Sequence, residues 1–322
     1  MDRRRAVGIA LILVSACSFG SGGLFAQPVY EQGVGWHVLS AWRFGFGSLL
    51  AWLWVLAWPD ARRGLRLLDR RTVLVAIGLG VLYTVNSGTY YAGLEDVPVS
   101  LASLIVYIYP AIVAVIALRV GRRLEGRRPW FALALALAGV ALAVGGIPEG
   151  RTPPIGALAL IVASPIIYSI WIVLSARLAG ERRESVGRDA ADGADAAAAT
   201  ALMISATAAT YWIGALVFGA PAGPDRIPAA AWPGLVGVGV IATFVAIQTF
   251  YAGARRIGAA QAALVSTIEP IWTIVLAAIL FGQTLAPTQL VGGAFIIVGV
   301  LIAQAPPEAF SSIRPGVRLA DE

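Results

Sequence analysis

The amino-acid sequence predicts an all-α integral membrane protein with ten transmembrane helices, arranged as two inverted five-helix repeats. The first observation is composition: 58% of the 322 residues are hydrophobic and 13% are charged, whereas about a quarter of the residues of a soluble domain are charged. The second is a series of ten apolar runs, each near the ~20 residues that cross a bilayer as a helix. The third is a motif that occurs twice with its turn charges reversed.

The ten apolar runs are separated mostly by short loops rich in Gly, Pro or Arg, which are typical helix boundaries. We expect the first repeat over residues 1–150, the second over 151–305, and a disordered cytoplasmic tail over 306–322. The longest polar stretch, which begins at Ala179, is predicted to be a mobile linker. The runs cover approximately residues 6–26, 36–58, 72–92, 99–119, 129–147, 155–177, 197–219, 231–253, 259–281 and 286–304.

The basic residues predict the orientation of these spans. All 24 are Arg, and 21 of them lie in the loops and termini on one side of the predicted bundle. Loops rich in Arg face the cytoplasm, so both termini are expected there. This distribution explains the net charge of +6 without nucleic acid, and the lipid bilayer is the expected partner. A monomer is compatible with the sequence.

The repeated motif indicates that the second repeat is inverted in the membrane relative to the first. The stretch YYAGLEDVPVSLASLIVYIYP from Tyr90 matches FYAGARRIGAAQAALVSTIEP from Phe250 at an offset of 160 residues. Five spans are an odd number, so the second copy enters the membrane upside down. Its turn therefore faces the cytoplasm and carries Arg255-Arg256, where the first copy carries Glu95-Asp96. Inverted repeats of this kind underlie many secondary transporters. A weaker likeness pairs GIALILV at Gly8 with GALALIV at Gly156.

Two longer motifs carry a family resemblance that covers about residues 7–304: SLIVYIYPAIVAVIALRVG, and ALVSTIEPIWTIVLAAILFGQTLAPTQLVGGAFIIVGV. With ten spans in two halves and a Pro in the fourth span of each half, the chain resembles the drug/metabolite transporter superfamily, and more specifically its EamA-type exporters. Family members often carry Gly-Glu where this chain has Gly121-Arg122 and Gly282-Gln283, so no role of that Glu carries over. The resemblance implies a transporter of the bacterial inner (plasma) membrane. It is closest in character to exporters of amino acids, including aromatic ones.

Polar and aromatic side chains on single helix faces predict a central cavity, because such faces point inward in membrane proteins. Core packing and the interfacial aromatic belt are the alternative explanation for each aromatic residue. Pro110 and Pro270 lie near the middle of their predicted helices and are expected helix breaks, or hinges, at the level of the cavity. The faces comprise Tyr83, Asn86 or Ser87, and Tyr90; Ser103 and Tyr107, with Tyr109 beside the Pro; Ser164, Tyr168, Trp171 and Ser175; and Phe244, Gln248 and Tyr251.

Two charged residues lie inside predicted spans. Glu269 is about 15 Å deep, where an unpaired carboxylate is costly. It is either a proton- or cation-coupling site, an anchor for a substrate amino group, a member of an ion pair, or a neutral hydrogen-bonded acid. Arg43 lies about seven residues from the outer end of its span and is expected to extend to the interface. Pairing with Glu269 and attraction of a substrate carboxylate are its alternatives.

The sequence offers no catalytic or cofactor site. One Cys and one His exclude a disulfide framework and a dense metal cluster, and there is no ATP-binding loop. The prediction is a secondary transporter, not an enzyme, that exports small amphipathic metabolites by alternating access. Amino acids, aromatic or large and neutral, are the favoured cargo. A nucleotide-sugar, lipid-precursor or drug transporter of the same fold is the alternative, although phosphate cargoes call for several cavity-facing cations and only Arg43 is available. A membrane enzyme or scaffold is the more distant alternative.

Overall fold

The computed structural model describes residues 3–120, 128–145, 152–178, 191–257, 262 and 265–304. These residues form helices and connecting turns, without a strand among them. The predicted tail 306–322, most of the linker from Ala179 and the boundary between the two predicted repeats lie outside them. Six helical segments are long and apolar enough to cross a membrane: Arg3–Glu31, Trp36–Ala57, Arg70–Gly93, Ile155–Leu174, Ala197–Val217 and Ala229–Ala254. The shorter apolar helices are Val99–Val113, Trp130–Val144, Ile268–Phe281 and Pro287–Ile302. The exact number of crossings stays a prediction.

The helices of the first half coincide with the predicted runs, except that two runs are each divided into two helices. The first run becomes α1 and α2, and the fourth becomes α6 and α7, while the short α4 lies between the second and third runs. The bounds are α1 Arg3–Gly20, α2 Gly22–Glu31, α3 Trp36–Ala57, α4 Pro59–Leu67, α5 Arg70–Gly93, α6 Val99–Val106, α7 Tyr109–Val120 and α8 Arg128–Gly145.

The second half contains one long helix with a π-helical segment in its interior, Val240–Val245. This segment joins α11 to α12 within the predicted eighth run. Two short 3-10 turns, Pro224–Arg226 and Ala229–Ala231, precede α11. The bounds are α9 Ile155–Leu178, α10 Ala191–Val217, α11 Trp232–Gly239, α12 Ala246–Ile257, α14 Ile268–Phe281 and α15 Pro287–Gln304.

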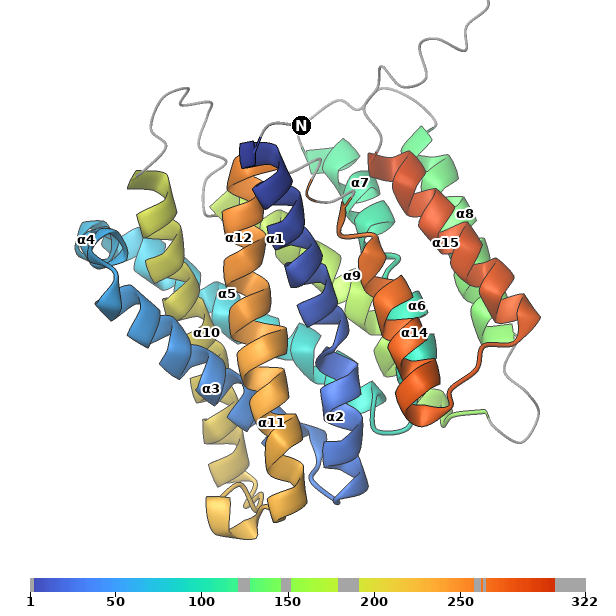
Figure 1. The fold of residues 1–322 in the computed structure, drawn as a ribbon, viewed down its shortest axis with the longest axis horizontal. Helices are drawn as coiled ribbons and strands as arrows, with labels where there is room; N and C mark the ends of the chain where they lie inside the picture. Colours follow the sequence, from blue (N-terminus) through green and yellow to red (C-terminus); the bar gives the residue numbers. More distant parts are fainter. Residues whose placement is uncertain are drawn as a thin grey trace, which may run out of the picture.

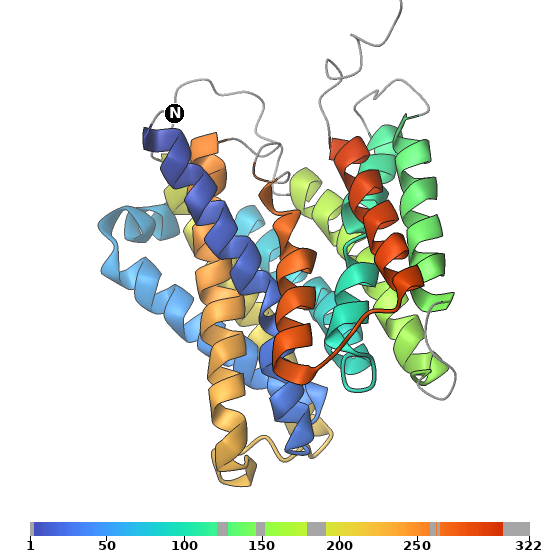
Figure 2. The same cartoon turned by 45° about the vertical axis from the view of Figure 1, so that its right-hand side comes forward.

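The helices pack in pairs that combine the two halves (Figures 1 and 2). α8 lies along α15, α1 along α12, and α3 along α10, while α5 packs on both α9 and α10. The start of α1 and the last turns of α12 and α15 lie at the same end of the bundle (Figure 1). We call this end the predicted cytoplasmic end, and the opposite end, which contains the turn after Gly93, the predicted outer end.

Glycine allows the closest of these contacts. A Cβ atom added to Gly139 of α8 would lie 2.5 Å from the carbonyl oxygen of Gly292 on α15, and one added to Gly299 would lie 2.7 Å from the carbonyl oxygen of Ala132. Small residues at such crossings let helix backbones approach each other in a membrane. The offset of 160 residues relates Gly139 to Gly299 and Ala132 to Gly292. The two contacts are therefore equivalent, with α8 and α15 in exchanged roles, as the predicted repeat requires.

A second pair of glycine contacts follows the same relation. A Cβ atom on Gly253 would lie 2.7 Å from a carbon of Ile12, and one on Gly93 would lie 2.6 Å from a carbon of Ile161. These contacts relate α1 to α9 at an offset of 149 residues, one residue away from the pairing that GIALILV and GALALIV suggest. They support the inverted repeat, which remains a prediction about the chain's topology.

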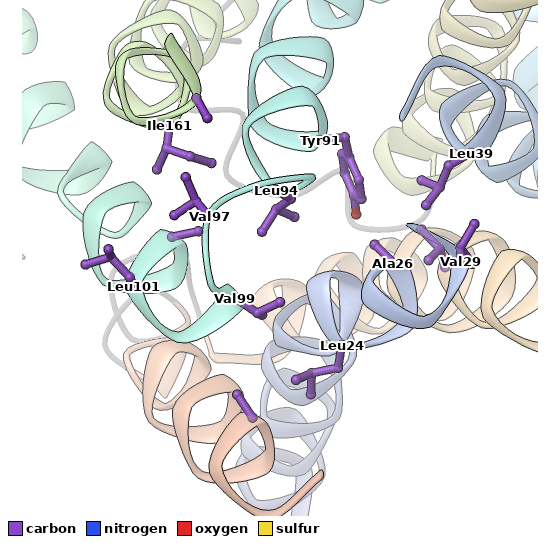
Figure 3. Close-up of a cluster of buried hydrophobic side chains, with 14 of the residues drawn as sticks. Leu24, Ala26, Val29, Leu39, Tyr91, Leu94, Val97, Val99, Leu101 and Ile161 are labelled. Carbon is purple, nitrogen blue, oxygen red and sulfur yellow. The ribbon is translucent and has the colours of Figure 1, made fainter. Parts of the chain in front are cut away.

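The largest buried cluster lies toward the predicted outer end (Figure 3). It joins α2, α3, the end of α5 and the start of α6, and in Figure 3 Val99 lies against α2, while Tyr91 points towards Ala26 of α2. Gly23 allows this approach, because a Cβ atom there would lie 2.7 Å from a methyl carbon of Val99. The residues around α2 are therefore closely packed at this end.

The fourth run shows how the predicted proline break is built. α6 ends at Val106 and α7 begins at Tyr109, so Pro110 occupies the first turn of α7 and not a helix interior. A Pro in a first turn removes no helical hydrogen bond. The break therefore lies at Tyr107 and Ile108, just before the Pro. Pro270 likewise lies in the first turn of α14.

Candidate functional site

One cavity of about 710 Å³ lies between the two halves of the bundle. Its volume is within the range of ~300–1,000 Å³ that is typical of small-molecule sites. It brings together most of the predicted site residues, from α5, the break between α6 and α7, α7, α9 and α14. These residues are Tyr83, Asn86, Tyr90, Tyr107, Tyr109, Pro110, Ser164, Tyr168, Trp171, Glu269 and Pro270.

Aromatic rings from α5, α7 and α9 form one wall of the cavity. The rings of Tyr168 and Trp171 are stacked, with centroids 5.9 Å apart and planes 13° apart. Tyr83 lies 5.0 Å from Trp171, and Tyr109 meets Tyr168 edge-on at 4.9 Å. Such pairs hold one another in fixed orientations and add about 0.5–1.5 kcal/mol each beyond burial. We call Tyr83, Tyr109, Tyr168 and Trp171 the aromatic wall.

Hydrogen bonds to neighbouring helices fix this wall. The indole nitrogen of Trp171 donates to the carbonyl oxygen of Leu79 at 2.9 Å. The hydroxyl of Ser169, one residue after Tyr168, donates to the carbonyl oxygen of Tyr109 at 3.1 Å. The hydroxyl of Ser164 donates to the side-chain oxygen of Asn86 at 3.3 Å. The Asn86 amide nitrogen has no hydrogen bond among the described residues and lies in the cavity lining, where it is available to a ligand.

Gln248 and Phe244 of the predicted face lie outside the cavity lining. The sequence predicts the face Phe244, Gln248 and Tyr251, but the residues that line the cavity are Thr243, Ile247 and Phe250. The two sets have the same helical spacing, and the cavity-lining set is one residue earlier in the chain. The prediction followed polar and aromatic residue types, whereas the lining here includes the apolar Ile247. The side chains of Tyr251 and Ser175 are outside the described part of the chain.

Arg43 does not extend to the interface, and that expectation is wrong. Its side chain is only 7% exposed and lines the cavity. The guanidinium carbon lies 4.7 Å from the centre of the Phe44 ring and 4.6 Å from that of Tyr91. The Nε atom donates to the hydroxyl of Thr243 at 2.8 Å. Depth along a span cannot decide between the interface and the cavity, and the cavity-facing position was the alternative that the sequence left open.

Glu269 lies at the start of α14 and faces the same cavity. Among the described residues its carboxylate forms neither an ion pair nor a hydrogen bond, so pairing with Arg43 is excluded in this conformation. Its backbone is held firmly, because the hydroxyl of Thr273 donates to the carbonyl oxygens of Gly20 and Glu269, at 2.8 and 3.0 Å. An acid on a fixed backbone with a free carboxylate is available to a cation or to a proton.

Residues of α10 also line the cavity, and the sequence did not predict them. Thr200 and Thr207 lie seven residues apart on one face of α10 and line the cavity with Met203 and Ile204. The Thr207 hydroxyl donates to the carbonyl oxygen of Gly80 on α5, at 2.7 Å. The spacing of the two Thr residues was the available signal, but an Ala-rich helix with small polar residues is equally typical of plain packing.

Hydrogen bonds across the predicted outer end accompany the buried cluster there. The Gln283 side chain donates to the side-chain oxygen of Gln27 at 2.8 Å, and its own oxygen accepts from the backbone and hydroxyl of Ser100, at 3.2 and 3.1 Å. Gly282 precedes it with φ +63°, a left-handed helix cap that favours glycine. Gln283 thus joins α2, α6 and α14, and we call this arrangement the Gln283 junction.

Comparison with known proteins agrees with this architecture. The sequence profile of the EamA-like transporter family matches residues 6–145 and 190–304. The chain belongs to the EamA-like transporter family. It is therefore a membrane transporter of the drug/metabolite transporter superfamily.

Individual relatives match along nearly their whole length. An uncharacterized transporter of Archaeoglobus fulgidus is 28% identical over 296 residues, which are 92% of this chain and 96% of the relative. The uncharacterized transporter YcbK of Bacillus subtilis is 26% identical over 314 residues, with 92% and 93% covered. A solved crystal structure, 19% identical, superposes with a TM-score of 0.57 over 93% of this chain and 96% of that chain. At this identity the likeness concerns the fold alone.

Proposed function

We propose that this EamA-family transporter is a secondary exporter of small amphipathic metabolites, and that amino acids with aromatic or large neutral side chains are its cargo. The observation that carries the proposal is the cavity between the two halves. An apolar body fits the aromatic wall, and a few polar groups, Asn86, Arg43 and Glu269 among them, are available to polar handles. A site with apolar walls and few polar anchors suits such ligands.

The charge content of the cavity argues against phosphate cargoes. Nucleotide-sugars and lipid precursors carry at least one phosphate, which proteins bind with several Arg or Lys residues or helix N-termini. Arg43 is the single cation among the described residues that line the cavity, and Glu269 would repel a phosphate. An amino acid carries no excess charge and needs no such cluster.

Alternating access is the proposed mechanism. The breaks before Pro110 and Pro270 lie in helices that line the cavity, and the predicted outer end is closed by packing and by the Gln283 junction. We propose that the halves rock about the level of these breaks and that an ion gradient drives transport. The proposed location is the bacterial inner membrane with both termini in the cytoplasm, as the Arg distribution predicts. We propose that the transporter works as a monomer.

The test is uptake into liposomes that contain the purified protein. We expect labelled phenylalanine or leucine to enter faster than into protein-free liposomes, and unlabelled aromatic or large neutral amino acids to compete. A pH gradient across the membrane should change the rate if a proton is coupled. Glu269→Gln should then lose the pH dependence while it remains folded.

The control is Thr72→Ser on the first turn of α5, far from the cavity lining, which should transport normally. If folded protein takes up no amino acid at any gradient, the amino-acid proposal is wrong, although family membership stands. Uptake of a nucleotide-sugar in the same liposomes would establish the alternative cargo.

A further inference from the structure

We propose that Arg43 is the anchor for the carboxylate of the cargo, and that Glu269 receives the cargo's ammonium group. This assignment rests on the proposed function, because it concerns the substrate of the same site. It adds an orientation: the carboxylate points to α3 and the π-helical segment, the ammonium to α14, and the apolar side chain to the aromatic wall.

The first step is that Arg43 is a buried cation without a counter-ion. It is 7% exposed, and no carboxylate among the described residues forms an ion pair with it. The faces of Phe44 and Tyr91 offset part of the cost of burial through cation–π contact. Rings do not satisfy the guanidinium's N–H groups, however, and an uncompensated cation in a membrane protein generally marks a site for an anion.

The second step concerns the atoms of the guanidinium that remain available. The Nε–H group is occupied by the Thr243 hydroxyl at 2.8 Å. The two terminal nitrogens make no hydrogen bond among the described residues. Neither is a fully enclosed atom, since the enclosed side-chain atoms without a partner belong to Ser40 and Ser87. The terminal edge of the planar group can therefore receive both oxygens of one carboxylate.

The third step is that the group is held in place. Thr243 lies within the π-helical segment, and its hydroxyl, which accepts from Arg43, donates in turn to the carbonyl oxygen of Val238 at 2.9 Å. π-helical turns occur frequently at functional sites. Two stacked rings and this relay fix the plane of the guanidinium, so little freedom is lost when a carboxylate binds. Thr243 is the positioning residue of the anchor.

The fourth step is the balance of charge. Within the described part of the chain, Arg43 and Glu269 are the two charged residues that line the cavity. They have opposite sign, and they do not pair with each other. A ligand with one anionic and one cationic group compensates both at once. An α-amino acid has this pattern next to an apolar side chain. A simple amine or a simple carboxylic acid compensates only one of the two charges.

The experiment measures how well three probes compete with labelled phenylalanine in the liposome assay. The probes are phenylalanine, phenylalaninamide, which lacks the carboxylate, and 3-phenylpropionate, which lacks the ammonium. In the wild type we expect each analogue to compete at least about tenfold more weakly than phenylalanine, the loss expected for one charged hydrogen-bonded pair.

Two variants then show which residue binds the carboxylate of the cargo and which binds its ammonium group. In Arg43→Gln the ratio between phenylalaninamide and phenylalanine should approach one, because the carboxylate no longer contributes. In Glu269→Gln that ratio should persist while the discrimination against 3-phenylpropionate disappears. A residue with a merely structural role would change the overall rate and leave both ratios unchanged.

Two further variants protect the test against misfolding. Thr243→Val keeps the charge of Arg43 but removes its tether, and should reduce the discrimination against phenylalaninamide while the protein elutes as a single species. Arg43→Lys keeps the charge but loses the planar fork, and should do the same. Folded Arg43→Gln protein with the wild-type ratio would overturn the assignment. So would unchanged ratios in both Thr243→Val and Arg43→Lys, if Arg43→Gln does not fold.

The same measurements distinguish an error in the assignment of Arg43 and Glu269 from an error in the proposed function. Wild-type protein that transports no amino acid refutes the proposed function before any variant is compared. Wild-type protein that transports phenylalanine but accepts phenylalaninamide equally well refutes only the role of Arg43. Equal acceptance of 3-phenylpropionate refutes only the role of Glu269.

Discussion

The two predicted repeats share their packing contacts but differ in the side chains that they present to the cavity. Gly139 and Gly299 make reciprocal backbone contacts, and so do Gly93 and Gly253 with α9 and α1. At the related positions 109 and 269, however, one half has a Tyr within the aromatic wall and the other has a Glu. The packing contacts between helices are therefore symmetric between the two halves, and we call them the symmetric frame. The side chains that face the cavity are asymmetric.

A pair of serines shows the same division in detail. Ser15 and Ser164 occupy related positions on α1 and α9. Ser15 donates to the backbone oxygen of Ala246 at 2.7 Å, whereas Ser164 donates to the side-chain oxygen of Asn86 at 3.3 Å. The hydroxyl is kept in both halves, but only the first half adds an amide that faces the cavity. Helix pairing is thus conserved between the halves independently of ligand chemistry.

The largest expected effect is a difference between two related positions, which is tested by comparing Glu269→Gln with Tyr109→Phe. Both substitutions remove one polar function from related positions and keep the size of the side chain. We expect Glu269→Gln to reduce amino-acid uptake by about tenfold or more, because a charged contact is lost. Tyr109→Phe keeps the ring of the aromatic wall and should change uptake less than about twofold, since a ring contact does not need the hydroxyl. Initial uptake rates at equal protein content decide this, and equal losses would contradict the asymmetry.

The aromatic wall gives the second prediction. Phe19 and Tyr168 are at related positions and both line the cavity, but Tyr168 also contacts the rings of Tyr83, Tyr109 and Trp171. Tyr168→Ala should weaken competition by unlabelled phenylalanine by about tenfold, as expected for the loss of one or two aromatic contacts. Phe19→Ala should have a smaller effect. A larger effect at Phe19 would place the apolar side chain of the cargo on α1 and not on the aromatic wall.

The symmetric frame is tested by Gly139→Ala and Gly299→Ala. Each new Cβ atom would lie within 3 Å of the partner helix's backbone, so α8 and α15 must separate in both variants. We expect both variants to lose about 1–3 kcal/mol of stability, the usual cost of overpacking. Thermal unfolding in detergent should show two similar decreases in midpoint.

Gly78→Ala is the matched control for these two variants. A Cβ atom there meets nothing within 4 Å, so the substitution should leave stability unchanged or raise it by up to about 1 kcal/mol through helix propensity. A strong loss in only one of Gly139→Ala and Gly299→Ala would contradict a shared frame.

The smallest expected effect concerns the starts of the related helices α5 and α11. Asp69 caps α5 by accepting from the backbone nitrogen of Thr72 at 3.0 Å, whereas α11 begins without a side-chain cap. Hydrogen bonds from Thr72 lower the pKa of the Asp69 carboxyl below its usual value. Asp69→Ala should therefore reduce the unfolding midpoint slightly at neutral pH.

The pH dependence of this small difference follows from the direction of the pKa shift. A pKa that is lower in the folded state stabilises the protein above the unfolded pKa of about 3.9, and the effect is lost as the pH falls through the folded value. The difference between wild type and Asp69→Ala should thus shrink in acid. A difference that stays constant down to the lowest pH at which the protein folds would contradict the capping role of the carboxylate.

The sequence predicted the all-α membrane fold and many of the polar and aromatic residues that line the cavity, because apolar run length and polar helix faces are local properties. It favoured the interface for Arg43 and placed Gln248 on a cavity face. Arg43 contacts the rings of Phe44 and Tyr91 and donates a hydrogen bond to Thr243. Tyr91 and Thr243 come from distant parts of the chain. Gln248 was misplaced because the prediction followed residue polarity, whereas the face that lines the cavity is one residue earlier and includes the apolar Ile247.

The break in the fourth run also depends on more than its Pro. The sequence placed Pro110 in a helix interior, but the chain begins a new helix at Tyr109 and leaves Tyr107 and Ile108 between the segments. Neighbouring helices determine where such a break falls, and Ser169 of α9 supplies one hydrogen bond there, to the carbonyl oxygen of Tyr109. Spacing alone cannot give this partner.

The most direct test of the central claim, that the cavity between the halves binds the cargo, is protection of a cavity cysteine from alkylation. In a Cys17→Ser background, Ser103→Cys places a thiol in the cavity lining, and Arg62→Cys places one on the exposed surface of α4. We predict that phenylalanine, at concentrations that saturate uptake, slows labelling of Ser103→Cys and leaves labelling of Arg62→Cys unchanged. Equal labelling of Ser103→Cys with and without phenylalanine, in protein that still transports phenylalanine, would contradict binding of the cargo in this cavity.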